Sequence, residues 1–314
     1  IMFASDLTFG FFLLSEISFG LTGNLLFFAL HMYTILFQHH LRKPIDVIFT
    51  HLALVNVLTI MFRLIPDTMS SFRGGHLFND VGCKTVLYIY RVTWNLSICT
   101  TALLSTFQAI TISPSNSKWA WLKCKLPSCI FPSFLFFWII NMLIYIQVIE
   151  TVIASSNSSL VVSGYSQEYC KANGINQLSY VILSAMIVHD VLFVVLMMET
   201  SLYMVHLLCR HHRKAQHVHS NRLSSQPSPE NKATHSILFL VSCFVFFYFS
   251  NNFITFYLLF GPEKTLGFER ITGILASGYP TICPFVLIKN IKITWTFFSI
   301  SDTKFVFSQR GLSG

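Results

Sequence analysis

The sequence predicts an all-α membrane protein: one bundle of seven transmembrane helices, followed by a short amphipathic helix. Three observations lead to this prediction. Of the 314 residues, 53% are hydrophobic and only 11% are charged, whereas soluble domains carry about 25% charged residues. Seven separate apolar stretches are each long enough to cross a bilayer, which takes about 20 residues per helix. The basic residues lie mostly in the links between these stretches.

The first four helices are expected over residues 7–37, 45–65, 83–112 and 126–151. The first contains a single charge, Glu16, and no basic stretch with a small-residue cleavage site precedes it. It is therefore interpreted as a retained helix rather than a cleaved signal. The second, third and fourth contain the uncharged runs 47–62, 92–117 and 126–149, which favour membrane spans.

The last three helices are expected over residues 176–209, 233–260 and 270–288. The fifth carries Asp190 and Glu199, whereas the sixth and seventh contain long runs without any charge. Proline removes a backbone donor, so Pro280 is expected to kink the seventh helix. Residues 289–298 mix basic and apolar side chains, and we expect them to form an amphipathic helix on the inner leaflet. The whole chain, 1–314, is read as one domain.

The charge of the links indicates the orientation. Most Lys and Arg residues fall in the links 38–44, 113–125 and 210–232 and in the tail from residue 289. The opposite links contain far fewer. Because cytoplasmic links are enriched in Lys and Arg, we expect a cytoplasmic C-terminus and an extracellular N-terminus.

Two features of the outer links agree with this orientation. Cys83 opens the third helix and Cys170 precedes the fifth, and they are the two cysteines expected on the oxidising side. We expect them to form a disulfide, the alternative being two unrelated thiols. Asn157 begins an Asn-Ser-Ser acceptor sequence in an outer link, so it is a candidate glycosylation site, although such sequences also arise by chance.

Several classes of protein are disfavoured. The net charge of +8 is spread over many links, so no nucleic-acid partner is expected. No nucleophile elbow, phosphate loop or metal-ligand motif is present, which argues against an enzyme and against a cofactor. The histidines near residue 211 lack an accompanying acidic or thiol ligand, so no metal site is expected. A seven-helix transporter remains an alternative, but no internal symmetry supports it.

Short sequence motifs narrow the class of membrane protein. Gly23-Asn24 resembles the Gly-Asn pair of rhodopsin-like receptors, and residues 51–56 resemble their Leu-Ala-x-x-Asp segment with Asn56 in place of Asp. The third helix ends with residues 104–114 in place of the Asp-Arg-Tyr word, and the seventh contains residues 277–288 in place of Asn-Pro-x-x-Tyr. These replacements resemble those of the vomeronasal type-1 receptors, a pheromone receptor family.

This resemblance covers almost the whole chain and implies a G-protein-coupled receptor in the plasma membrane. It implies a small, pheromone-like or volatile chemosignal as ligand and an inhibitory-class heterotrimeric G protein as partner. The lipid bilayer is the third partner. The alternative within the receptors is the bitter-taste type, which also lacks Asp-Arg-Tyr. The cysteine pair and the helix-seven word argue against that alternative.

Polar residues within the membrane are costly and mark candidate sites. The candidate ligand-binding residues lie in the outer part of helix three and in the middle of helix five: Tyr90, Arg91, Trp94, Asn95 and Asp190. A cation, aromatic rings and an amide suit a small apolar ligand with one polar or acidic group. The alternative for Arg91 is a structural ion pair with Glu168 or Asp190, and the alternative for Asp190 is an interhelical hydrogen bond.

A second group of residues is expected to form the polar centre and the switch of the bundle: Asn24, Asn56, Gln108, Tyr279 and Pro280. Asn56 is neutral where rhodopsin-like receptors hold sodium with Asp, so weak sodium dependence is expected. Gln108 stands in the segment where those receptors carry a charged Arg. The charged lock of such receptors is therefore absent here.

Overall fold

The computed structural model describes residues 4–38, 43–73, 78–114, 120–154, 166–167, 170–172, 177–218, 229–260 and 266–288. Its helices are α1 (Ala4–Phe37), α2 (Pro44–Arg73), α3 (Asp80–Ile112), α4 (Ala120–Ile144), α5 (Gln147–Thr151), α6 (Gln177–Val218), α7 (Pro229–Phe260) and α8 (Leu266–Ile288). Among these residues, seven helices are long and apolar enough to cross a membrane, all except the short α5. The chain is thus a seven-helix membrane bundle.

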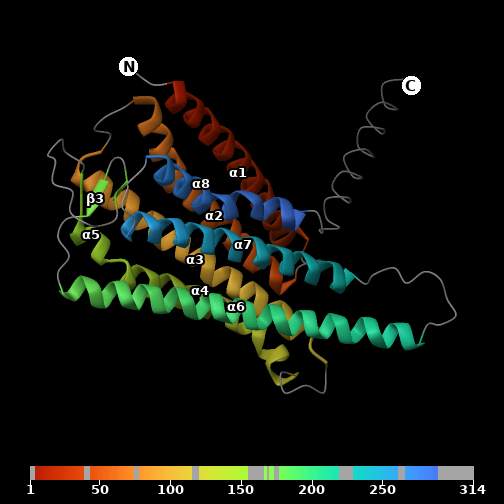
Figure 1. Cartoon of the computed structure of the whole chain (residues 1–314). Helices are drawn as coiled ribbons and strands as arrows, with labels where there is room; N and C mark the ends of the chain where they lie inside the picture. The colour runs from red at the N-terminus through yellow and green to blue at the C-terminus, as the bar shows by residue number, and fades with distance from the viewer. Residues whose placement is uncertain are drawn as a thin grey trace, which may run out of the picture.

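The helix α3 is the centre of the bundle. It packs against α2, α4, α6 and α7, and Figure 1 shows it running between them. Most of its side chains from Val92 to Ala102 are buried. The outer helices instead direct large apolar side chains away from the protein, for example Phe37 (72% exposed) and Phe253 (74% exposed). Such exposure is expected where lipid is the solvent.

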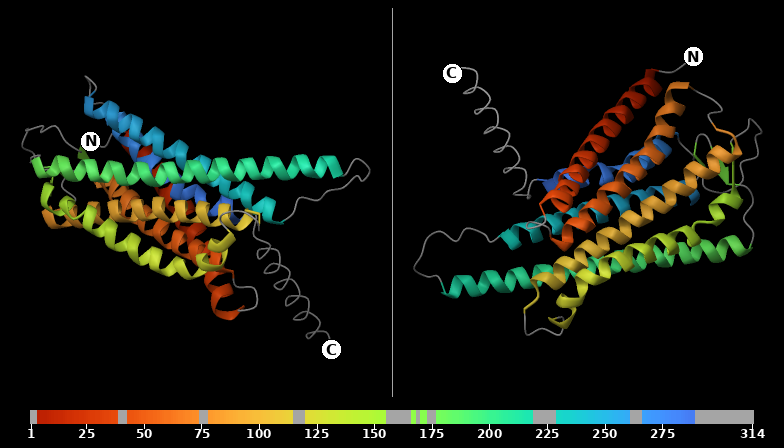
Figure 2. Two further views of the ribbon diagram at one scale, coloured as in Figure 1. Left: turned by 90° about the horizontal axis from the view of Figure 1, so that it is seen from below. Right: turned by 180° about the vertical axis from the view of Figure 1, so that it is seen from behind.

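Several helices extend beyond the ranges expected from hydrophobicity. The helix α2 continues past Pro66 to Arg73, and the hydroxyls of Thr68 and Ser71 bond to carbonyls one turn earlier. The helix α6 continues through a basic segment to Val218, because no Pro or Gly interrupts it. Figure 2 shows this extension reaching beyond the bundle. Hydropathy marks the membrane crossing, not the end of the helix.

The expected fourth helix is divided in two. It begins at Ala120 and ends at Ile144, and the short α5 follows after a turn at Tyr145 and Ile146. In this turn the Ile146 amide donates to the Leu143 carbonyl, three residues back. Apolar composition continues through the turn, so nothing in the hydrophobic pattern reveals the break.

A small antiparallel sheet closes the end of the bundle that holds α5. Its strands β1 (Val152–Ala154), β2 (Ser166–Gln167) and β3 (Cys170–Ala172) lie in the order β1-β3-β2. A disulfide joins Cys170 of β3 to Cys83 in the first turns of α3. Both cysteines are fully buried. The expected pairing is therefore present, and it fixes the sheet onto α3.

Some expectations fall on residues outside the described part of the chain. These are the inner-leaflet helix 289–298, the glycosylation candidate Asn157 and the alternative ion-pair partner Glu168.

Candidate functional site

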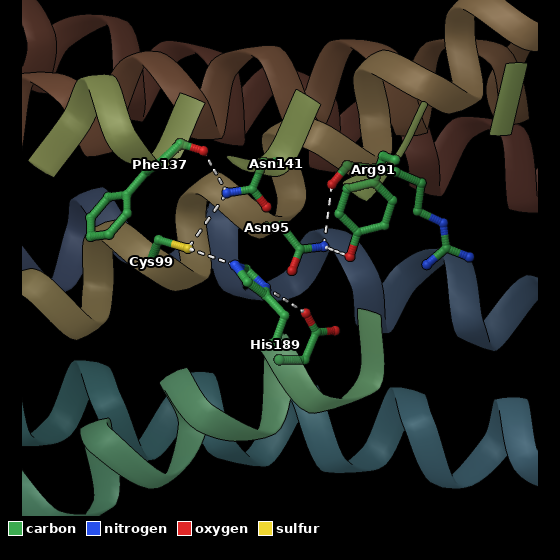
Figure 3. Close-up of polar contacts among 8 residues, drawn as sticks. Arg91, Asn95, Cys99, Phe137, Asn141 and His189 are labelled. Carbon is green, nitrogen blue, oxygen red and sulfur yellow. Dashed lines mark hydrogen bonds and ion pairs between the residues drawn. The ribbon is translucent and has the colours of Figure 1, made fainter. Parts of the chain in front are cut away.

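The candidate site lies in the half of the bundle that carries the sheet, between α3, α4 and α6. Three of its residues, Tyr90, Trp94 and Asn95, are at most 5% exposed, whereas Arg91 is partly exposed. The amide of Asn95 donates to the Arg91 carbonyl (3.3 Å) and makes a short hydrogen bond to the Tyr145 hydroxyl. Figure 3 shows this contact. Tyr145 lies in the break between α4 and α5, and its hydroxyl therefore contacts α3.

Arg91 approaches an aromatic ring. Its guanidinium carbon lies 5.9 Å from the centroid of the Tyr90 ring. In Figure 3 the guanidinium points away from His189. The Asp190 carboxylate, in turn, lies 3.5 Å from the Nδ1 atom of His189. The structure thus places the Arg91 cation beside the Tyr90 ring and the Asp190 carboxylate beside the His189 ring.

A line of polar contacts joins α3, α4 and α6. The Asn141 amide donates to the Phe137 carbonyl (2.8 Å) and to the Cys99 sulfur (3.7 Å). On its other side the Cys99 sulfur lies 4.0 Å from Nε2 of His189. Figure 3 shows Asn141, Cys99 and His189 directed toward one another. The Oδ1 atoms of Asn95 and Asn141 are buried and accept no hydrogen bond, so this site offers two acceptors to a donor.

Trp94 points toward another part of the bundle. Its ring packs near Phe244 of α7, with 6.5 Å between centroids. The ring of Phe244 meets Tyr279 of α8 edge-on at 5.0 Å, and the Tyr279 hydroxyl bonds to Thr101 of α3 at 2.6 Å. Aromatic packing therefore connects the candidate site with the buried centre of the seventh crossing.

Two of the residues expected in the polar centre, Asn56 and Asn24, each join their helix to another one. Asn56 accepts a hydrogen bond from Ser97 of α3 (2.8 Å). Asn24 of α1 donates to the Pro280 carbonyl of α8 (2.9 Å). The usual intrahelical donor to that carbonyl would be the amide of residue 284, which is a proline and has no N–H. Asn24 therefore replaces a hydrogen bond that the helix itself cannot make.

A charged cluster lies between α1, α2 and α8, and the sequence analysis identified only its Glu16 as an intramembrane charge. The Glu16 carboxylate accepts from the Ser277 hydroxyl (2.8 Å), and Arg63 lies 3.4 Å from Asp67 one turn later. The guanidinium of Arg63 is 5.4 Å from the Tyr90 ring, so the cluster borders the candidate site. A signal existed: Arg63 and Asp67 are spaced four residues apart in a segment that remains apolar around them.

At the opposite end, polar side chains hold α3 to α6 and α7. The amide of Gln108 donates to the Thr234 hydroxyl of α7 (3.0 Å). Ser113 shares a hydrogen bond with Tyr203 of α6 (2.9 Å), and Ser105 does so with Thr200. The side chain of Gln108 is 5% exposed, and Thr234 is fully buried. A neutral hydrogen bond between Gln108 and Thr234 therefore joins α3 to α7 at this end of the bundle.

The arrangement of helices, the central third helix and the disulfide to the sheet define the class of fold, which is that of the G-protein-coupled receptors. The chain matches the crystal structure of squid rhodopsin with a TM-score of 0.66, over 90% of this chain and 77% of that chain. At 16% identity this likeness shows the fold.

Sequence comparison then identifies the family. Residues 7–299 match the vomeronasal organ pheromone receptor family. The chain is 34% identical over 295 residues to the human vomeronasal type-1 receptor 3, covering 92% of this chain and 93% of that protein. It is 32% identical over 273 residues to the olfactory receptor class A-like protein 1 of Danio rerio, covering 86% and 85%. The chain therefore belongs to the vomeronasal organ pheromone receptor family, which is a family of receptors and not of enzymes.

Proposed function

We propose that this receptor detects a small, pheromone-like or volatile chemosignal at the site between α3, α4, α6 and α7, and signals through an inhibitory-class G protein. The observation that supports this site is its two groups of buried polar contacts, Asn95 with Tyr145 and Cys99 with His189, bordered by a cation and by aromatic rings. Pockets for small molecules are mostly apolar with a few placed polar groups. The proposed ligand is apolar with one polar or acidic group that meets Arg91.

The proposed orientation has the N-terminus outside and the C-terminus in the cytosol of a plasma-membrane receptor. Basic residues concentrate in the links at one end, and cytoplasmic links are enriched in them. The Cys83–Cys170 disulfide lies at the other end, as is expected on the oxidising side of a membrane. The candidate site is then reached from the extracellular half.

The proposed mechanism is a shift of population between a resting and an active bundle. A ligand that contacts Trp94 changes its packing on Phe244, and through it the position of α7. The α7 end then separates from α3, which breaks the contact between Gln108 and Thr234. The opened face, formed by the links 113–125 and 210–232, accepts the G protein.

The test measures ligand-evoked signalling in cells that express the tagged chain with an inhibitory-class G protein. A panel of small volatile and steroid-like compounds is applied to the wild type and to Arg91→Ala, Asp190→Asn and Lys84→Ala at equal surface levels. Lys84 lies two turns nearer the end of α3 than Arg91, so it controls for the loss of a cation. We expect a response that a toxin specific for inhibitory G proteins abolishes, and that Arg91→Ala weakens at least tenfold while Lys84→Ala does not.

Two outcomes contradict separate parts of this proposal. A response that Arg91→Ala and Asp190→Asn both leave intact removes the ligand site from this position but keeps the receptor. A response that the toxin does not change removes the inhibitory-class G protein.

A further inference from the structure

The helix α6 lies at the edge of the bundle and turns one face toward its surroundings. It packs mainly against α3, and Figure 1 shows it along the lower edge of the molecule. Its bundle side includes Met197 and Met204, which are fully buried. Glu199 follows Met197 by two residues, and an α-helix turns about 100° per residue. Glu199 therefore points away from the bundle, and its side chain is exposed.

Glu199 lies near the middle of a membrane crossing. The apolar span of α6 is Ser184–Arg210, so Glu199 stands 15 residues after its start and 11 before its end. At about 1.5 Å per residue it is about 16 Å from Arg210 along the helix, and half of the hydrocarbon core is about 15 Å thick. Long Lys and Arg side chains near helix ends can reach the interface. A shorter Glu side chain near the middle of a span cannot do so.

The protein itself offers this carboxyl group no partner. In the part of the chain that the structure describes, no ion pair includes Glu199 and no hydrogen bond reaches its side chain. Its neighbours on the same face are Leu192, Val195 and Leu202, each at least 50% exposed. His206 is also exposed there, but it lies two turns, or about 10 Å, further along the helix.

This placement is unusual for an ionisable side chain in a membrane. Such residues almost always face the bundle interior or a water-filled cavity and pair with another group, because a lone charge in hydrocarbon is costly. Glu199 instead faces the lipid from the middle of an apolar face. A basic side chain from outside the chain, at the same depth, would compensate this cost.

A second copy of this chain does not fit the same face. Two copies in one membrane are related by an axis along the membrane normal, so an isologous contact brings the same patch of both copies together. Each residue then meets its own equivalent at equal depth. Glu199 would meet another glutamate, and like charges at one site disfavour each other. The charge of this face therefore favours a different protein with the opposite charge.

We propose that the outer stripe of α6, formed by Leu192, Val195, Glu199, Leu202 and His206, is the docking surface for a transmembrane helix of another protein. That helix presents a Lys or Arg side chain to Glu199 and apolar side chains to the leucines. Asp190 of the candidate ligand site lies nine residues before Glu199, which is the opposite side of α6. The docking surface is thus separate from the ligand site, and its mid-span position makes it independent of the proposed orientation.

The experiment uses the purified full chain, labelled with a donor fluorophore, in phosphatidylcholine vesicles. The probe is a synthetic single-span peptide of Leu and Ala with one central Lys and an acceptor fluorophore, and a second peptide carries Leu at that position. Energy transfer at known peptide-to-lipid ratios measures association. We expect the wild type to bind the Lys peptide about fivefold more tightly than the Leu peptide, and Glu199→Leu to abolish this preference. Glu150→Leu removes another exposed acid, at the end of α5, and should preserve it.

A charge reversal separates a direct contact from a loss of folding. Glu199→Lys should lose the Lys peptide and gain a preference for a peptide with a central Glu. If that variant fails to fold, Glu199→Leu still decides, because it makes the span more apolar. Equal binding of the Lys and Leu peptides, or a preference that Glu199→Leu leaves unchanged, overturns the proposal.

Energy transfer between two labelled copies of the receptor tests the remaining occupant. We expect any self-association to be the same in the wild type and in Glu199→Leu. Self-association that Glu199→Leu abolishes would make a second copy the partner of this face and overturn the proposal. Because association is measured without any signalling, failure of the proposed ligand site leaves this result intact.

Discussion

At the scale of single residues, each backbone N–H or C=O group that lacks a hydrogen-bond partner within the membrane costs free energy. The two prolines of α8 illustrate this, because Pro284 cannot donate to the Pro280 carbonyl. Asn24 of α1 supplies the missing donor. The pairing of Asn24 with the seventh crossing could be predicted in outline from polarity alone. Its true partner, a backbone carbonyl, could not, because it depends on how α1 is rotated against α8.

This contact makes a prediction about stability. Asn24→Leu leaves the Pro280 carbonyl buried without a donor, which costs about 1–3 kcal/mol, and should lower the midpoint of thermal unfolding in detergent. In a Pro284→Ala background the alanine amide restores the intrahelical donor, so Asn24→Leu should cost clearly less. An equal loss in both backgrounds would show that the asparagine acts by packing.

The contact between Gln108 and Thr234 makes a prediction about basal signalling. A neutral hydrogen bond contributes about 1 kcal/mol, so its removal shifts the resting equilibrium about fivefold. Gln108→Ala and Thr234→Val should each raise ligand-independent signalling by about this factor, and the double variant should raise it no further. Additive effects, or a loss of coupling in Gln108→Ala, would contradict a shared contact that holds the resting state. The readout is basal cyclic-nucleotide level at matched surface expression.

At the scale of elements, the sequence predicts the crossings well and their interruptions poorly. Long uncharged runs specify helices because the bilayer permits little else. The break after Ile144 and the three-stranded sheet lie beyond this rule, since the first occurs in unchanged apolar sequence and the second joins short strands distant in sequence. The charged cluster at Glu16 could be predicted only in part, because the spacing of Arg63 and Asp67 is visible in the sequence but the packing of α1 against α2 and α8 is not.

The close contact of α7 with α8 depends on Gly278, a residue without a side chain. A Cβ atom added at Gly278 would lie 2.4 Å from the Phe247 ring, and small residues allow close approach between membrane helices. Gly278→Ala should therefore lower thermal stability and surface expression, with a cost of about 1–3 kcal/mol from overpacking. Phe247→Leu should rescue it in the double variant. A Gly278→Ala protein as stable as the wild type would mean that the two helices separate without cost.

At the scale of the whole molecule, the seven crossings of the described residues place the start of α1 and the end of α8 on opposite sides of the membrane. The proposed orientation predicts that Asn157 carries a glycan in mammalian cells. Treatment with a glycosidase that removes N-linked glycans should increase the gel mobility of the wild type, and Asn157→Gln should already migrate at the faster position. Antibody access to an N-terminal tag on intact cells checks the same orientation independently. A tag accessible only after permeabilisation would reverse the assignment of inside and outside.

The amide–hydroxyl contact between Gln108 and Thr234, at the end of α3 away from the sheet, has a consequence for the cell that carries this receptor. Neither Gln108 nor Thr234 gains or loses a proton in the range of pH found in a cytosol, and a buried neutral pair is little affected by ionic strength. If this contact sets the resting balance, that balance should stay constant when the pH and the ion concentrations around this end of the bundle change. A receptor restrained in this way reports its ligand against a steady background, whatever the recent activity of the cell.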